Sequence, residues 1–180
     1  MKHIYKTSTA LFMALAVFAM IFTGCKKSDS NNGGGVTPVP TGNYGTITVG
    51  NNSYTIKIGG YEAYYDDELQ TNVVTIALAD GTSESANMYG LSIPNYNDIP
   101  TGTFEYVVLN EADNMCMGTF IQGSTQSALL CVSGTVTITQ SGSKYKIVSS
   151  GIASDNPFGT PGSGLQFSVN FEGPLVNETE

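Results

Sequence analysis

The sequence has no arginine and no tryptophan, and its only histidine is His3. Its 180 residues hold 15 acidic side chains against 7 basic ones, all lysines, for a net charge of −8. A chain this short of cations is a poor partner for nucleic acid and for anionic lipid. A Ser-His-Asp triad, a histidine metal centre and an arginine clamp on phosphate all need residues that do not occur after His3.

We therefore expect no catalytic residue, no metal and no cofactor. A pair of carboxylates is the one catalytic arrangement that this composition still permits, because two acids are sufficient to hydrolyse a glycoside. No spacing of acids in the sequence singles out such a pair.

The first 24 residues have the organisation of an export signal. Lys2 and Lys6 precede a run of 16 almost continuously apolar residues, 7–22, and the polarity changes abruptly at Cys25. The run is shorter than the roughly 20 residues that a helix needs to span a bilayer, which disfavours a permanent membrane helix.

The end of this segment, Thr23-Gly24-Cys25, resembles the lipobox of bacterial lipoproteins. In those proteins small residues precede a cysteine that is acylated on its sulfur before the peptide is cut in front of it. The resemblance implies that residues 1–24 are a signal peptide and that fatty acyl chains such as palmitate on Cys25 anchor the chain in a membrane. The alternative is an ordinary cleaved signal followed by an incidental cysteine.

Residues 25–43 read as the lipidated cysteine and a flexible tether, because serine, asparagine, glycine and proline leave little to bury. A tether of about 18 residues reaches roughly 20 to 25 Å, so the domain should work close to the membrane. Lipobox, tether and β-rich domain together resemble small envelope lipoproteins of the Bacteroidota, which implies the outer membrane. Only Asp29 stands where surface-exposed members often carry an acidic cluster, so the surface and the periplasmic face both stay open.

Residues 44–176 are predicted to form one all-β domain, followed by a short tail, 177–180. Apolar residues alternate with Thr, Ser and Lys at period two, and no stretch has a helical period. Two hairpins are predicted, with turns at residues 51–52 and 141–142. The first turn sets Val49 opposite Tyr54, and the second sets Ile138 opposite Tyr145. Further strands are expected within 72–80, 87–93, 102–109, 115–121, 128–139 and 164–173.

These eight to nine short strands are joined mostly by short connections, which favours antiparallel neighbours. We favour an antiparallel β-sandwich, with a lipocalin-like up-and-down barrel as the alternative. Alternation at period two is the same in both architectures. The longest predicted strand, 128–139, should bend near Gly134.

Cys116 and Cys131 flank a polar loop. A hairpin centred between Gly123 and Ser124 would set them directly opposite each other, and an exported chain meets an oxidising compartment, so they are a candidate disulfide. The alternative is two reduced cysteines buried as small apolar side chains.

The strongest candidate for a binding site is a tyrosine-rich and acidic stretch in the predicted long loop 60–72. Together with one tyrosine of a second loop, its candidate contact residues are Tyr61, Tyr64, Tyr65, Asp66, Asp67, Glu68 and Tyr96. Three interpretations are open: a calcium site built from carboxylates, a glycan-binding surface in which tyrosines stack on sugar rings, and an acidic edge that keeps the domain soluble.

Two functions follow as expectations. The first is a membrane-tethered, non-catalytic module of the envelope that binds a glycan or a protein near the membrane. The second is a structural or accessory component of an envelope protein complex.

Overall fold

The computed structural model describes residues 41–83, 85–108, 115–125, 127–157 and 164–178. All regular elements in these residues are strands, which confirms the predicted all-β class. Within the same residues, no helix has the length and hydrophobicity to cross a membrane. The strands are β1 (Gly45–Val49), β2 (Asn52–Ile56), β3 (Ile58–Asp66), β4 (Thr71–Ala79), β5 (Met88–Pro94), β6 (Gly102–Tyr106), β7 (Met115–Gln122), β8 (Ser127–Ser141), β9 (Lys144–Ser154), β10 (Leu165–Gly173) and β11 (Val176–Asn177).

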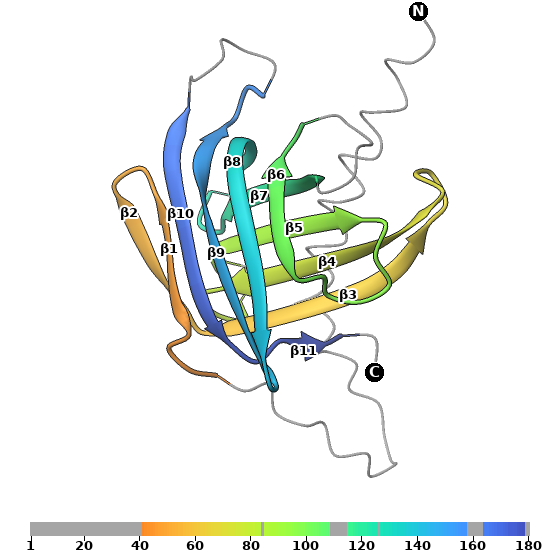
Figure 1. The fold of residues 1–180 in the computed structure, drawn as a ribbon. Helices are drawn as coiled ribbons and strands as arrows, with labels where there is room; N and C mark the ends of the chain where they lie inside the picture. The colour runs from red at the N-terminus through yellow and green to blue at the C-terminus, as the bar shows by residue number, and fades with distance from the viewer. Residues whose placement is uncertain (1–40, 84, 109–114, 126, 158–163, 179–180) are drawn as a thin grey trace, which may run out of the picture.

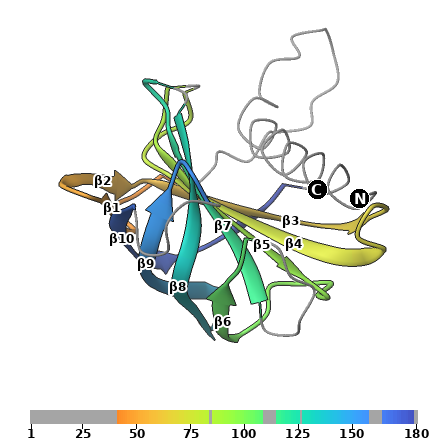
Figure 2. The ribbon, with the colours of Figure 1, turned by 90° about the horizontal axis from the view of Figure 1, so that it is seen from above.

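These strands form one curled sheet in the order β11-β3-β4-β5-β7-β6-β8-β9-β10-β1-β2, a half-barrel. In Figure 1, β1 and β8–β10 run upright while β3–β5 run across behind them. Figure 2 shows the two groups from above as separate arms of the sheet. Strands β2 and β3 are separated only by Lys57, whose N–H donates to the Ala79 carbonyl. The chain itself thus links the edge strand β2 to β3, which lies next to the opposite edge strand β11.

The favoured sandwich is therefore not what the structure has: eleven strands in a single sheet replace eight to nine strands in two sheets. The sheet is also mixed, because β6 pairs with β7 and β11 pairs with β3 in parallel. A bend in the long strand β8 helps the sheet to curl. Its pairing with β9 shifts between Cys131 and Ser133, next to Gly134, as the predicted bend required.

Both predicted hairpins exist, but each predicted register is wrong by two residues. Ile47 lies opposite Tyr54, and Ile138 lies opposite Ile147. In each turn a glycine, Gly50 or Gly142, takes the first central position with a φ of 57° or 59°, a conformation that glycine adopts without steric cost. A shift by two keeps every side chain on its predicted face.

The concave face of the half-barrel holds the core. Its buried residues come from nearly every strand, so one cluster holds the two arms together. Buried hydroxyls cross this core: Tyr89 of β5 shares a hydrogen bond with Tyr106 of β6, which shares one of 2.5 Å with Ser149 of β9. In the described residues no buried side-chain nitrogen or oxygen is left without a partner.

The predicted signal peptide 1–24 lies outside the described residues, as does the tether 25–43 up to residue 40. The end of that tether belongs to the domain, because Gly42 donates its N–H to the Lys57 carbonyl at 3.0 Å. The predicted tail also begins too early, since Asn177 is the last residue of β11.

Candidate functional site

The predicted long loop 60–72 is a hairpin, and its tyrosines lie on a strand. Strand β3 extends to Asp66, and β4 begins at Thr71. Tyr61 lies opposite Ile76, a fully buried core residue, so the Tyr61 ring belongs to the concave face, where it packs against the core. Period two places Tyr65 on the same face near the end of the hairpin, where it is 53% exposed.

Tyr96 comes to the same end of the sheet from the loop between β5 and β6. Its ring meets the buried Phe104 ring edge-on, with centroids 5.9 Å apart and planes at 90°. The residue before it, Asn95, has a φ of 70°, which asparagine tolerates better than most residues. Asn95 donates its N–H to the Asn72 carbonyl at 2.8 Å, which fixes this loop to the beginning of β4.

A fourth tyrosine reaches this region from the opposite arm. Tyr145 lies at the beginning of β9 and packs against the core as a partly buried ring. Burial raises the pKa of Tyr145, and the nearby charges of Asp98 and Tyr61 raise it further. Tyr145 is therefore within electrostatic reach of Asp98 and Tyr61, which come from two other segments.

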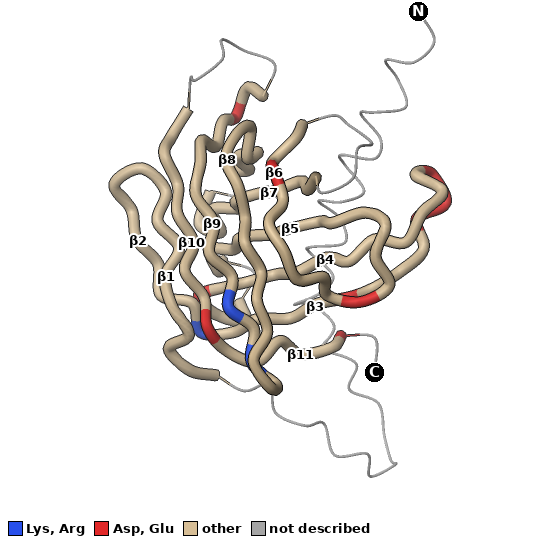
Figure 3. The backbone as a smooth tube through the Cα atoms, in the orientation of Figure 1, with Lys and Arg blue, Asp and Glu red and all other residues tan. Residues whose placement is uncertain are grey.

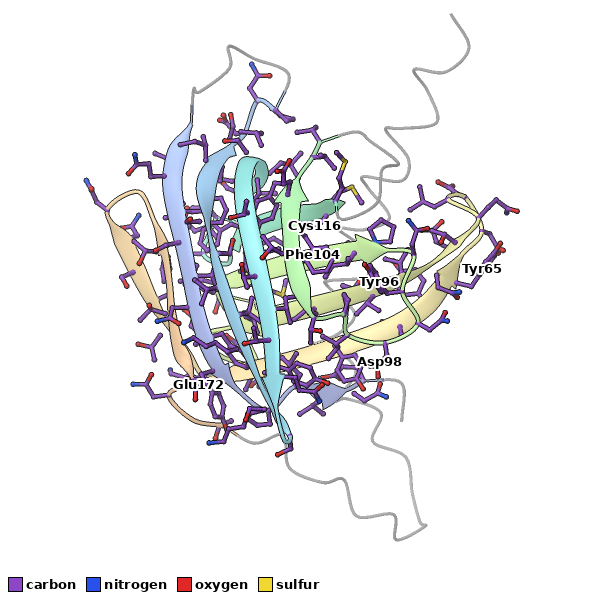
Figure 4. All side chains as sticks on the ribbon, viewed as in Figure 1. Tyr65, Tyr96, Asp98, Phe104, Cys116 and Glu172 are labelled. Atoms are coloured by element: carbon purple, nitrogen blue, oxygen red, sulfur yellow. The ribbon has the colours of Figure 1, made fainter. Side chains whose placement is uncertain are left out.

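We call this region the tyrosine surface and define it by Tyr61, Tyr65, Tyr96, Tyr145 and Asp98. Figure 4 labels three of these residues and shows them on one side of the half-barrel, near the hairpin of β3 and β4. The Asp98 carboxylate accepts a 2.7 Å hydrogen bond from the Ile99 N–H, and its side chain is exposed. The surface thus combines aromatic rings with an exposed hydrogen-bond acceptor, the combination that sugar recognition uses.

Tyr64 does not belong to the tyrosine surface. It lies opposite Val73 on the convex face of β3, and its pKa is raised by burial and by the charges of Asp66 and Glu62. The alternation of a strand explains the separation, because Tyr64 and Tyr65 must point to opposite faces.

The acidic residues of the stretch serve the turn. The Asp66 carboxylate accepts hydrogen bonds of 2.9 Å from the N–H groups of Glu68 and Leu69, which closes the hairpin. Asp67 and Glu68 are exposed. In the part of the chain that the structure describes, no three His, Cys, Asp or Glu residues are grouped so that they could hold a metal ion. The calcium interpretation has no ligand cluster there.

A pair of carboxylates that the sequence did not single out lies on the convex side of β3. The Glu178 side chain, just after β11, lies over Gly60, close enough that a Cβ on Gly60 would come within 2.8 Å of Glu178 Oε1. Burial and the charge of Glu62 raise the pKa of Glu178. The parallel pairing of β11 with β3 joins segments that are distant in the sequence, so no local sequence pattern could have predicted that Glu178 lies near Glu62.

Cys116 and Cys131 are both buried free thiols, the second of the two predicted alternatives. The directly opposite register was wrong, because Thr119 pairs with Leu130, which brings Gly118 rather than Cys116 opposite Cys131. Strand β6 also enters between β7 and β8 at this point and pairs Tyr106 with Cys116. Burial raises the pKa of Cys116 to about 12 and that of Cys131 further, so both thiols stay protonated and unreactive near neutral pH.

Cys25, the predicted lipidation site, lies outside the described residues. Comparison of the whole chain with models of protein families, with curated proteins and with solved structures finds no significant match in any of the three.

Proposed function

We propose that this chain is a membrane-tethered, non-catalytic binding module of the bacterial cell envelope that captures a glycan on the tyrosine surface. The observation that carries the proposal is that Tyr65, Tyr96 and Asp98 lie on one side of the half-barrel, with Tyr145 within electrostatic reach of Asp98. Tyr65 is the most exposed large hydrophobic residue among those described, at 53%. An exposed ring of this kind gives a sugar a flat apolar surface on which to stack.

The charge around the surface restricts the ligand. Figure 3 shows acidic residues in the hairpin turn of β3 and β4 and in the loop after β5. Lys144 and Lys146 flank Tyr145 on β9, but alternation along the strand points them to the opposite face of the sheet. Asp98 and the turn acids Asp67 and Glu68 disfavour an anionic sugar. We therefore expect a neutral oligosaccharide.

The tether is part of the proposal. After removal of the signal peptide 1–24, lipid on Cys25 would anchor the chain in the outer membrane. The flexible tether would then hold the tyrosine surface close to that membrane. Cys25→Ser should leave folding intact and release the protein from the membrane fraction. Continued membrane association of that variant would remove the support for the tether.

Glycan binding is tested by titration of residues 41–178 with neutral oligosaccharides chosen from an array. Tyr65→Ala should weaken binding by roughly 3- to 10-fold, the range expected for one aromatic contact. Leu165→Ala is the matched control, because Leu165 is 48% exposed but lies on β10, away from the surface. Equal affinities for the two variants would contradict the assignment of the site.

The second candidate is a structural or accessory component of an envelope protein complex. It is favoured by the apolar residues Val73, Ala77 and Ala79 on the convex face of β4, which lies outside the main core. Crosslinking in intact cells distinguishes the two, since a complex component would be recovered with one constant protein partner and a glycan binder would not.

A further inference from the structure

The sheet ends in an open edge at β2. This strand pairs with β1 on one side, and within the described residues no strand lies on its other side. Figure 1 shows β2 at the outer end of the upright arm, and Figure 2 shows the same strand at the tip of that arm from above. An edge of this kind presents backbone N–H and C=O groups with which another strand can pair.

Two residues of β2 direct their backbone groups to this open edge. The Ile56 carbonyl accepts a 2.9 Å hydrogen bond from the N–H of Tyr44, directly before β1, so Ile56 faces β1. The next residue, Lys57, faces the other way and donates its N–H to the end of β4. Because successive residues of a strand face opposite edges, Ser53 and Thr55 direct their N–H and C=O groups away from β1. The edge therefore offers both donors and acceptors.

The sequence of β2 does not protect this edge. Exposed edge strands commonly carry lysine, proline or a bulge that prevents the addition of another strand. Strand β2 has the sequence Asn-Ser-Tyr-Thr-Ile, without a charge or a proline, and its pairing with β1 has no register shift. Ser53 and Thr55 are exposed, whereas the half-buried Tyr54 ring packs against Phe120 with centroids 5.7 Å apart. Only the length of five residues limits the pairing of a further strand with this edge.

The edge is complementary to itself. In an antiparallel arrangement of two copies, Ser53 of each copy can lie opposite Thr55 of the other, which uses the open groups of both. Each such pair exchanges both of its N–H···O=C bonds, and the two copies are related by a two-fold axis. The axis passes at Tyr54, so Tyr54 of one copy lies opposite Tyr54 of the other, at a Cα spacing of about 4.5 Å.

The side chains that meet in this register are compatible. On the convex side the hydroxyls of Ser53 and Thr55 face each other, and the Ser53 hydroxyl already accepts a 3.5 Å bond from Thr48 of β1. On the concave side the two Tyr54 rings lie beside each other, next to Phe120. Hydroxyl pairs and aromatic pairs both stabilise neighbouring strands. No charged side chain belongs to Asn52–Ile56, so no like charges meet.

We infer that the open edge of β2 is a dimer interface, which binds β2 of a second copy and joins two half-barrels into one continuous sheet. One short strand buries little area, so the dimer should be weak, with a dissociation constant of roughly 10 μM to 1 mM. The inference is independent of glycan binding, because no residue of the tyrosine surface belongs to β1 or β2.

Sedimentation over a range of protein concentrations tests the dimer. The chain used begins at residue 25 and carries Cys25→Ser, which removes the predicted lipidation site. Thr55→Pro removes an N–H from the open edge but none that bonds to β1, so this variant should fold. Its dissociation constant should rise at least about tenfold. Thr55→Val keeps the N–H and should dimerise within about threefold of the wild type.

A cysteine on the two-fold axis tests the register. Tyr54→Cys in the same chain, whose two native thiols are buried, should form an intermolecular disulfide under oxidised glutathione. Ser168→Cys, exposed on β10 and away from the edge, is the control and should crosslink at least about tenfold more slowly.

Three results would each overturn the inference. The first is a chain that stays monomeric up to about 1 mM. The second is equal dimerisation by Thr55→Pro and Thr55→Val, and the third is equal crosslinking of the two cysteine variants. If either Thr55→Pro or Tyr54→Cys does not fold, the other variant decides.

Discussion

The Thr71 hydroxyl donates a 2.8 Å hydrogen bond to the Asn95 side-chain oxygen. A second bond of 2.8 Å runs from the Asn95 N–H to the Asn72 carbonyl. Together they join the hairpin that carries Tyr65 to the loop that carries Tyr96, so the spacing of these two rings depends on a contact between residues 24 positions apart.

Thr71→Val should therefore weaken oligosaccharide binding without unfolding the domain. The lost hydrogen bond costs about 0.5 to 1.5 kcal/mol of stability, and the freed loop costs affinity because Tyr96 is no longer held for stacking. Calorimetric titration and thermal unfolding measure the two effects. Thr48→Val, which removes a surface hydroxyl bond to Ser53 on another part of the sheet, should leave binding unchanged. Equal binding by both variants would show that the loop is not positioned this way.

Tyr106→Phe should destabilise the domain by about 1 to 3 kcal/mol. Its hydroxyl bonds to both Tyr89 and Ser149 inside the core, so removing it leaves two buried hydroxyls without this partner. Urea unfolding measures the loss. Tyr54→Phe, on a half-buried ring that packs against Phe120, is the control and should change stability little. A Tyr106→Phe domain as stable as the control would mean that the hydroxyl chain does not stabilise the half-barrel.

The native thiols should resist alkylation at pH 8. Burial raises the pKa of Cys116 to about 12 and that of Cys131 further, so almost no thiolate is present. In a Cys25→Ser chain, iodoacetamide should label neither thiol until the domain is unfolded in urea. An added Ser168→Cys should react at once under native conditions. Rapid native labelling of Cys116 or Cys131 would contradict their burial.

Glu178→Gln should change how stability depends on pH. Burial and the charge of Glu62 raise the pKa of Glu178 above its ordinary 4.5, so the folded chain holds this proton more tightly than the unfolded chain does. The stability this provides is fully present below pH 4.5 and is lost as the pH rises through the raised pKa.

Glutamine does not ionise, so the Glu178→Gln variant should not lose stability as the pH rises. In thermal melts it should therefore gain stability relative to the wild type between pH 4 and pH 7. Glu172→Gln, on β10 and away from the contact of β11 with β3, is the control and should follow the wild type. A wild-type pH profile in the Glu178→Gln chain would show that β11 does not hold this carboxyl against β3.

Alternation at period two was sufficient to place most strands of the domain, because apolar and polar residues alternate along a strand that has one buried and one exposed face. It could not choose between a sandwich and a curled sheet, since the two bury the same residues. Both predicted hairpin registers are wrong by two residues because Gly50 and Gly142, which adopt a positive φ without steric cost, take the first central turn position in place of Asn51 and Ser141.

Only those residues of the candidate site that are close together in the sequence could be predicted. Tyr61 and Tyr65 were identified from one stretch, and Tyr96 from a second. Tyr145 and Asp98 were not, because strand pairing across the half-barrel brings them in from distant segments. Tyr64 was wrongly grouped with its neighbours while the stretch was taken for a loop, in which alternation does not apply.

The most direct test of the account is to map a neutral oligosaccharide onto residues 41–178 by changes in NMR amide chemical shifts. We predict that the largest shifts fall on Tyr65, Tyr96, Asp98 and Tyr145, and that a Tyr65→Ala/Tyr96→Ala variant loses them. Shifts confined to the convex face around Ala77, or no shift with any oligosaccharide, would contradict a glycan site on the tyrosine surface.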